Sequence, residues 1–322
     1  MNQSNRYFEL GAARREVMMN NPALLDAIVN GGRFGGDFSP AIANRMYSRK
    51  NASAIADARD GMRVEQHGDR SYLIRFPFVN VAAFDTDDGL VLVDAGFAPA
   101  GPALLEACTS ISDKPVHTII LSHFHCDHAF GAWALFEAGH RPEIVATADF
   151  VRELQADLDT WGLNSRYTNQ NPNDVPRDWD MAFTPTNTYH GSMSLDIGAM
   201  RFDLTHGRGE TADQQWVWVP DEKVIVSADY YQPFLPNAGN GKRRQRHIRD
   251  WAAALRAMAD CRPRISLPMH GAALGELESQ DRFRAHAAIL DSIAEQVLAG
   301  LNAGMRGSDV VETVVMPVQH AG

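Results

Sequence analysis

The sequence predicts an α/β protein, and three observations support this prediction. Short apolar runs separated by turn residues fill positions 62–94, as expected for neighbouring strands of a mostly antiparallel sheet. Strand-like and helix-like patterns then alternate over positions 102–154. The chain has 322 residues, 45% of them hydrophobic, and can therefore bury a large core. We expect one main domain over positions 61–322 and an N-terminal helical extension over positions 1–60.

The N-terminal extension is predicted to be helical mainly because of positions 21–28. A capping asparagine and a proline in the first turn precede an apolar stripe there. The glycine-rich positions 31–36 follow, but they lack both the preceding strand and the Gly-Lys-Ser/Thr ending of a phosphate-binding loop. A flexible loop near the site is the better interpretation of this segment.

The main domain opens with predicted strands divided by turn clusters at positions 67–69 and 85–89. Further strands are expected where apolar runs reappear, and helices where the apolar spacing becomes helical. The predicted strands are 62–66, 71–76, 79–84, 89–94, 116–121, 215–219, 224–228 and 265–269, and the predicted helices are 102–110, 129–138 and 274–302. Positions 143–154 are predicted as a strand then a helix, and positions 310–318 as a strand. Positions 155–190 look less regular, and their aromatic residues either line a pocket or pack as a satellite cluster.

A cluster of potential metal ligands directly follows the apolar strand 116–121. It consists of His123, His125, Asp127 and His128. Side chains two residues apart in an extended backbone point the same way, so the first two histidines can close on one ion, while the turn can direct the other two residues toward a second ion. Neutral imidazole with carboxylate is the ligand set that zinc and iron prefer. The alternative, a polar turn with unrelated histidines, leaves this concentration of ligands unexplained.

The His-x-His-x-Asp-His pattern resembles the signature of the metallo-β-lactamase superfamily of metal-dependent hydrolases. The resemblance implies an αββα sandwich with two divalent metal ions at one edge, zinc first, with manganese or iron as alternatives. It also implies two later ligands that each follow an apolar strand, Asp229 as a bridging carboxylate and His270. Asp94, at the end of the strand 89–94, would support the metal loop by hydrogen bonds.

The third ligand of the first metal has two candidates, Glu210 and His206. Relative to Asp229, Glu210 lies where most members of the superfamily carry a histidine. In this respect the chain resembles the alkylsulfatase branch, where a glutamate occupies this position. His206 is the alternative ligand, and Glu210 could instead be an ordinary turn carboxylate. With Glu210 as the ligand, His206 would support a ligand or the substrate by a hydrogen bond.

The resemblance therefore implies a complete binuclear site. One ion would be held by His123, His125 and Glu210, the other by Asp127, His128 and His270, with Asp229 bridging the two. A hydroxide shared by the metals would attack an ester-like centre, and Asp127 and Asp229 would be the catalytic residues, with Asp127 relaying the proton.

The segment between Asp229 and His270 suggests the substrate. It begins with aromatic residues and continues into positions 242–249, the most basic run of the chain. Arginine can grip a sulfate, carboxylate or phosphate group through two hydrogen bonds, although a basic run can also be a solvated surface. The expected substrate-binding residues are Tyr231, Asn237, Arg243 and Arg244.

A sulfate ester is the first prediction for the substrate, followed by a lactone, thioester or phosphoester. A persulfide dioxygenase with one iron and a non-catalytic binding protein are more distant alternatives. The net charge of −10 and the pI near 5.6 argue against nucleic acid and favour a small-molecule partner. No signal peptide or membrane span is evident, so we expect a cytoplasmic protein. Its three cysteines do not suggest a disulfide framework, and the helix 274–302 could form a homodimer contact.

Overall fold

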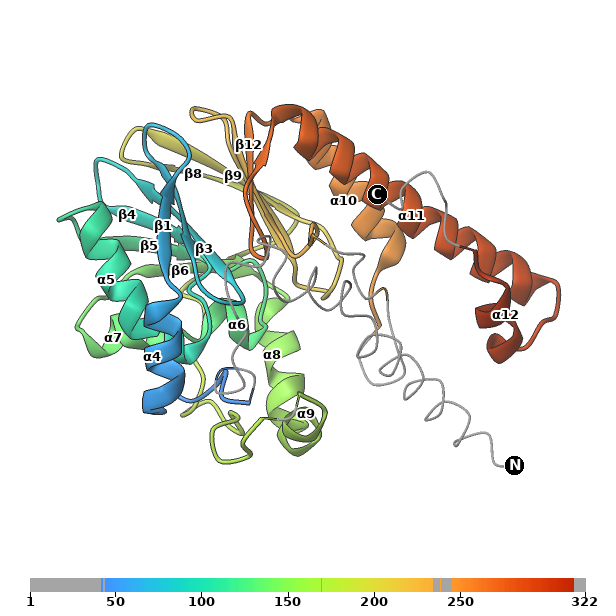
Figure 1. The fold of residues 1–322 in the computed structure, drawn as a ribbon, viewed down its shortest axis with the longest axis horizontal. Coiled ribbons are helices and arrows are strands. Elements are labelled where there is room, and N and C mark those ends of the chain that lie inside the picture. Colours follow the sequence, from blue (N-terminus) through green and yellow to red (C-terminus); the bar gives the residue numbers. More distant parts are fainter. Residues whose placement is uncertain (1–41, 43, 169, 234–237, 239–244, 316–322) are drawn as a thin grey trace.

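The fold is a two-sheet sandwich with helices on the outer faces (Figure 1), as expected from the sequence. The computed structural model describes residues 42, 44–168, 170–233, 238 and 245–315. The predicted helix at 21–28 and the glycine-rich segment 31–36 lie outside the described residues. Within the described ranges no helix is both long enough and apolar enough to cross a membrane.

The first sheet has seven strands in sequence order. These are β1 (Arg63–Gln66), β2 (Ser71–Arg75), β3 (Asn80–Asp85), β4 (Leu90–Val93), β5 (Val116–Ile120), β6 (Glu143–Thr147) and β7 (Asn187–Tyr189). The first four pair antiparallel, while β4 to β7 run parallel. The strand β4 is buried throughout because the second sheet covers one face and helices cover the other.

The second sheet has six strands in the order β13-β12-β11-β10-β9-β8. Their bounds are β8 (Ser192–Ile197), β9 (Met200–His206), β10 (Gln215–Val219), β11 (Val224–Ala228), β12 (Ile265–Pro268) and β13 (Leu274–Gly275). Only β11 and β12 are parallel, and the helix α10 (Ile248–Asp260) connects them. Parallel neighbours need such a crossover, which explains the helix between the two strands.

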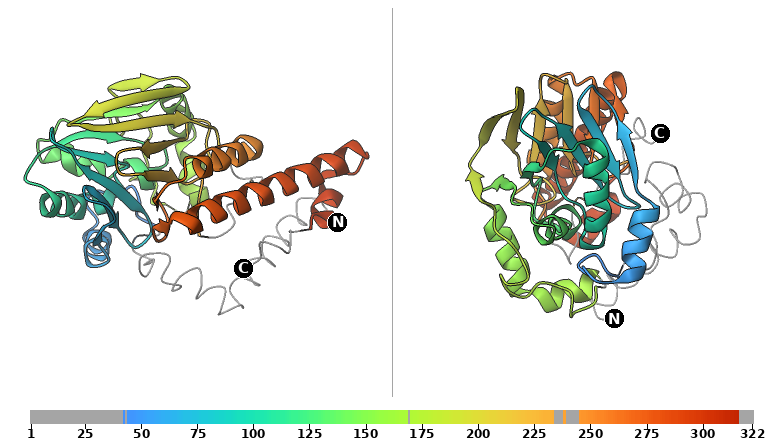
Figure 2. Two further views of the ribbon diagram at one scale, coloured as in Figure 1. Left: turned by 90° about the horizontal axis from the view of Figure 1, so that it is seen from above. Right: turned by 90° about the vertical axis from the view of Figure 1, so that its left-hand side faces the viewer.

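The helices lie on both sides of the sandwich. The elements near the first sheet are α4 (Ala52–Asp60), η1 (Ala98–Ala100), α5 (Gly101–Ile111), α6 (Cys126–Ala129), α7 (Ala132–Glu137), α8 (Phe150–Asp159) and α9 (Trp161–Thr168). On the other side, α10 packs against α11 (Glu276–Asn302), which extends beyond the sheets as a long rod and carries α12 (Gly307–Thr313) near its end (Figure 2). The segment 155–190 contains the end of α8 and all of α9, so it is more helical than the sequence suggested.

The strand predicted at 310–318 is wrong over its described part, because α12 extends to Thr313. One of the valines that suggested a strand, Val310, packs against another helix instead. Val310 is 2% exposed, and its side chain lies where Gly300 of α11 leaves room: a Cβ at Gly300 would come within 2.8 Å of Val310 Cγ2. Tertiary packing has overridden local β propensity at this position.

Polar side chains join the two sheets at the edge where β4, β5, β11 and β12 end. Asn80 Nδ2 donates to the carbonyl oxygens of Pro268 (2.8 Å) and Gly271 (2.7 Å). Gln215 donates from its backbone N–H to Ser122 O (2.9 Å) and from Nε2 to Leu121 O (2.7 Å). The loops that follow β5 and β12 are thereby fixed relative to each other, and both carry candidate metal ligands.

Candidate metal centre

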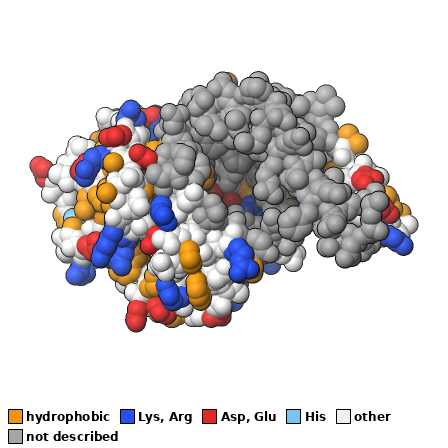
Figure 3. Space-filling model, turned by 60° about the horizontal axis from the view of Figure 1, so that its bottom comes forward, with side chains coloured by type: hydrophobic (Ala, Val, Ile, Leu, Met, Phe, Trp, Pro, Cys, Tyr) orange, Lys and Arg blue, Asp and Glu red, His pale blue; other side chains and the backbone are white. Residues whose placement is uncertain are grey.

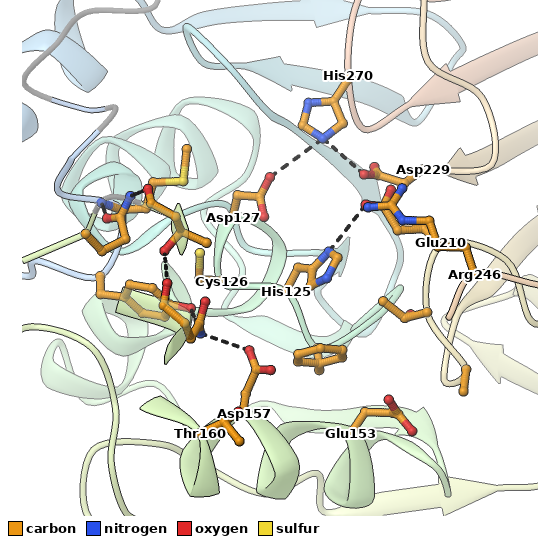
Figure 4. A pocket seen from close by; sticks show the side chains of 18 of the residues that line it. His125, Cys126, Asp127, Glu153, Asp157, Thr160, Glu210, Asp229, Arg246 and His270 are labelled. Atoms are coloured by element: carbon orange, nitrogen blue, oxygen red, sulfur yellow. Dashed lines mark hydrogen bonds and ion pairs between the residues drawn. The ribbon is translucent and has the colours of Figure 1, made fainter. Parts of the chain in front are cut away.

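The seven predicted metal ligands lie together at one end of a cavity of about 730 Å³ (Figure 4). His125, Asp127, Glu210, Asp229 and His270 line the cavity. The other two, His123 and His128, are completely buried beside them. Figure 3 shows acidic and basic side chains together at the bottom of a hollow on this side of the molecule.

The loop after β5 is held by Asp94, as the family resemblance implied. This carboxylate accepts hydrogen bonds from the backbone N–H (2.6 Å) and the hydroxyl (2.8 Å) of Ser122. It also lies 2.8 Å from Nδ1 of His128, which leaves Nε2 of that ring directed toward the centre of the site. Asp94 is fully buried and has a φ of 66°, a conformation that costs energy for a residue other than glycine. Its network of hydrogen bonds stabilises that conformation.

Side chains from three loops converge around Asp229. Nε2 of His128 lies 3.5 Å from both Asp127 Oδ2 and Asp229 Oδ1. Nε2 of His270 lies 3.2 Å from Asp229 Oδ2 and 3.7 Å from Asp127 Oδ2. The other ring nitrogen of His270 is 2.8 Å from the carbonyl oxygen of Phe78, which orients the ring. Two imidazoles and two carboxylates therefore present potential ligand atoms to one small volume.

This arrangement fits a divalent cation. Nε2 of His128 and Oδ1 of Asp229 are buried and have no hydrogen-bond partner among the described residues. Leaving such atoms without a partner is costly, and a shared cation would satisfy both. The ligand atoms of His123, His128 and Asp229, and those of Asp127, His128 and His270, form two groups in which all atoms lie within 4.8 Å of one another. Nitrogen and oxygen donors of this kind suit zinc, manganese or iron.

The remaining pair of histidines lies next to Glu210. Nε2 of His123 and Nδ1 of His125 are 2.8 Å apart, and Nδ1 of His125 is 3.9 Å from Glu210 Oε1. Glu210 is positioned by its neighbours: its backbone N–H donates to Gln214 Oε1 (2.7 Å), and Gln232 Nε2 donates to its Oε2 (3.2 Å). The carboxylate of Glu210 thus lies beside His125, with which it was predicted to share an ion.

His206, the alternative ligand, faces away from this cluster. Its Nε2 lies 2.7 Å from the carbonyl oxygen of Ala212 and 3.9 Å from Asp149 Oδ2. The ring closes the turn between β9 and β10, and it is absent from the described residues that line the cavity. A structural role in the turn explains its position.

Replacing His206 with alanine should leave the metal content unchanged, because the ring contacts the turn and not the candidate ligands. The measurement is elemental analysis of the purified variant. His125→Ala is the matched control, since it removes an imidazole beside Glu210 and should reduce the bound metal. Loss of metal from His206→Ala with an intact fold would restore His206 as a ligand.

The charges of the cluster shift its protonation in the absence of metal. Burial disfavours the charged forms of both Asp229 and His270, but their mutual attraction prevails: the pKa of Asp229 falls well below its usual range, and the pKa of His270 rises to about 9. Burial and the neighbouring Asp229 raise the pKa of Glu210 to about 7, although Arg246 opposes this shift. The metal-free protein therefore holds protons that a metal must displace.

Metal-free protein should lose stability between pH 6.5 and 9. Over this range the unfolded chain releases the proton of His270 while the folded chain keeps it, so the free energy of unfolding falls as pH rises. Denaturant unfolding of chelator-treated protein at several pH values would measure the slope. His270→Gln, which cannot titrate, should make the slope shallower without abolishing it, because neighbouring carboxylates also raise the pKa of the buried His128 despite its burial. A wild-type stability that rises with pH would contradict the expected charge state of these histidines.

Of the predicted substrate-binding residues, only Tyr231 belongs to the described part of the chain. Asn237, Arg243 and Arg244 fall outside the described residues. Tyr231 is 3% exposed and packs in the core, where its ring stacks on His286 of α11 at a centroid distance of 5.0 Å and meets Phe283 edge-on. It is not among the described residues that line the cavity, because the apolar surface of α11 takes up its ring.

Arg246 and Gln232 line the cavity and contact Glu210, and neither was predicted from the sequence. The guanidinium of Arg246 forms an ion pair with Glu210, and its side chain is only 6% exposed. Gln232 Nε2 lies 3.0 Å from Asp229 Oδ2 as well as near Glu210, so it links the two carboxylates. The basic run did point to an arginine in this region, and Arg246 is a member of the run that lines the cavity within the described residues.

Comparisons with known proteins found related sequences. The sequence profile of the metallo-beta-lactamase superfamily matches residues 74–270. A linear primary-alkylsulfatase of Pseudomonas sp. (strain ATCC 19151) is 24% identical over 266 residues, which cover 74% of this chain and 50% of that protein.

Solved structures show the same fold. The stereoselective inverting sec-alkylsulfatase of Pseudomonas sp. superimposes with a TM-score of 0.70 at 18% identity, over 90% of this chain and 53% of its own. A metallo-beta-lactamase from Pontibacter korlensis gives a TM-score of 0.51 at 18% identity, over 71% of this chain and 99% of its own. The chain thus spans about half the length of these alkylsulfatases.

Proposed function

Because the chain belongs to the metallo-β-lactamase superfamily, we propose that it is a metal-dependent hydrolase that cleaves sulfate esters. The choice of sulfate depends on a buried arginine side chain beside the candidate metal ligands. Arg246 lines the same cavity as His125, Asp229 and His270, and its side chain is 6% exposed. The guanidinium already pairs with Glu210, but it has five N–H donors, and those not used by Glu210 can bind two oxygens of a sulfate at once.

The proposed cofactor is a pair of divalent ions, zinc first, with manganese or iron as alternatives. The ligands would be His123, His125, Asp127, His128, Glu210, Asp229 and His270. When bound, such ions lower the pKa of water and polarise an ester oxygen.

Three side chains of the protein would then accept the proton, bind the sulfate group and position the carboxylates. Asp127 faces the cavity with 14% of its side chain exposed, so its carboxylate can accept the proton of an attacking water. Arg246 would bind the oxygens of the sulfate group and offset their charge. Gln232 holds Asp229 and Glu210 in a fixed relation, so that neither carboxylate has to reorganise during the reaction. The nucleophile in this proposal is water and not a side chain.

The test is release of inorganic sulfate from a medium-chain alkyl sulfate by protein loaded separately with zinc and manganese. We expect release that stops when a chelator removes the metal. A lactone, a thioester and a phosphoester serve as parallel substrates. Turnover of one of these without sulfate release would contradict the sulfatase assignment while retaining the hydrolase, and activity that requires oxygen and one iron would contradict both.

A further inference from the structure

Glu210 lies in the loop that connects β9 to β10, residues 207–214, which we call the Glu210 loop. We propose that the buried Tyr230, next to Asp229 in the chain, positions this loop and thereby sets the affinity of the ion that Glu210 would share with two histidines. Tyr230 is a positioning residue in this proposal, since it is not among the described residues that line the cavity. The inference rests on the proposed function and concerns the pair of ions in the same site.

The hydroxyl of Tyr230 holds the two ends of the Glu210 loop together. Its O–H lies within hydrogen-bonding distance of the carbonyl oxygens of Gly207 and Gln214, the second at 3.0 Å. The two ends are also joined directly, because the N–H of Gly207 donates to the same oxygen of Gln214 (3.0 Å). The hydroxyl therefore ties the neck of the loop to the chain that follows β11.

The ring of Tyr230 supports the middle of the loop. A Cβ at Gly209 would lie 3.0 Å from Tyr230 Cε1 and 2.7 Å from Gln214 Oε1, so the loop backbone packs directly on both side chains. Tyr230 is completely buried and has no open space into which it could move. The residue before Glu210 is thus a glycine that allows this close approach.

Gln214 holds Glu210 from inside the loop. Its Oε1 accepts a hydrogen bond from the backbone N–H of Glu210 (2.7 Å), while its backbone carbonyl oxygen contacts the hydroxyl of Tyr230. Gln214 is completely buried, so water does not compete for this hydrogen bond. A shift of the neck would move Gln214, and the residue that carries the candidate ligand would move with it.

Tyr230 is itself fixed at the end of β11. Its backbone N–H donates to Ser227 O (3.1 Å), and its carbonyl oxygen accepts from Nε1 of Trp251 (2.8 Å), which is also completely buried. The preceding residue, Asp229, is a candidate ligand. One short turn therefore positions both Asp229 and the support of Glu210, and Figure 4 shows these two carboxylates on the same side of the cavity.

A change in the position of Glu210 should affect one ion more than the other. Among the described residues, both compact groups of potential ligands contain His128, and neither contains Glu210. Glu210 instead lies 3.9 Å from Nδ1 of His125. The ion at Glu210 therefore depends on where the loop places this carboxylate, whereas the ion at His128 does not. Loss of a group that orients a metal ligand lowers metal affinity about tenfold to a hundredfold.

The experiment measures the dissociation constants of two zinc ions by competition with a chelating dye, for the wild type and for Tyr230→Phe. We expect the variant to bind one ion with wild-type affinity and the other about tenfold to a hundredfold more weakly. Gln214→Met should give the same pattern, because it removes the acceptor for the N–H of Glu210. Nε2 of Gln214 has no hydrogen-bond partner among the described residues, so methionine also removes an unpaired buried donor, and the fold should be retained.

Tyr72→Phe is the matched control. Tyr72 is a partly buried tyrosine on β2 in the first sheet and is absent from the described residues that line the cavity. Its variant loses the same hydroxyl group, and both dissociation constants should stay at their wild-type values. Denaturant unfolding of the metal-free variants checks that each is folded, and Gln214→Met decides the question if Tyr230→Phe does not fold.

The outcomes separate the two proposals. Unchanged constants for both ions in folded Tyr230→Phe or Gln214→Met would overturn the positioning role and leave the hydrolase intact. Equal weakening of both ions would overturn it as well, since general destabilisation does not distinguish one ion from the other. A wild type that binds fewer than two zinc ions would contradict the proposed pair of ions and this inference with it. Absence of sulfate release, with the expected zinc constants, would contradict the proposed substrate and retain the role of Tyr230.

Discussion

Replacing Asp229 with alanine should reduce turnover by at least about a thousandfold and lower the metal content of the protein. Asp229 is the one side chain that approaches His128 (3.5 Å) and His270 (3.2 Å) while also accepting from Gln232 (3.0 Å), among the residues described here. Its removal would leave two buried histidines without their shared carboxylate. Elemental analysis and sulfate release, measured on the same preparation, would test both effects.

A suitable control for this variant is Asp213→Asn. Asp213 is 1% exposed and lies in the turn after Glu210, but its carboxylate is not part of either group of candidate ligands. Burial raises its pKa to about 7, so a neutral amide should be tolerated there. We expect the control to keep its metal and most of its activity. Full metal content and activity in Asp229→Ala would show that the cluster does not bind metal as proposed.

The local part of the site could be predicted because the sequence itself places the residues together. Four potential ligands follow one strand within six positions, so they lie close together in almost any fold: His123, His125, Asp127 and His128. Asp229 and His270 are distant in sequence, but each follows an apolar run. The parallel pair β11 and β12 brings the ends of those two strands to the same edge.

The cavity wall could not be predicted in the same way. The position of Arg246 in the cavity depends on where α10 begins, and the sequence carries no local signal for that boundary. Tyr231 illustrates the same difficulty, because an aromatic residue after a strand can face a cavity or a helix with equal ease. Here α11 provides the apolar surface that holds its ring. The polarity of α8 toward the cavity likewise appears only once that helix is placed opposite the ligands.

Replacing Arg246 with methionine should raise KM for a sulfate ester by about tenfold to a hundredfold, because charge-assisted hydrogen bonds to the anionic group are lost. A neutral carboxylic ester should be affected much less. Arg208→Met is the matched control: Arg208 is 52% exposed and pairs with Asp250 at 2.6 Å, so its loss should leave both substrates unaffected. Steady-state kinetics on the two esters, with unfolding curves to exclude misfolded protein, would measure the difference.

The two substrates also separate the two roles that Arg246 can have. The guanidinium lowers the pKa of Glu210, so its removal should favour the protonated form of that carboxyl group and weaken metal binding. That effect would reduce the turnover of charged and neutral esters alike and would diminish at high metal concentration or higher pH. A defect confined to the sulfate ester and insensitive to added metal would assign Arg246 to the substrate. An equal defect for both esters that added metal reverses would instead assign it to positioning Glu210, and would remove the main support for sulfate as the bound group.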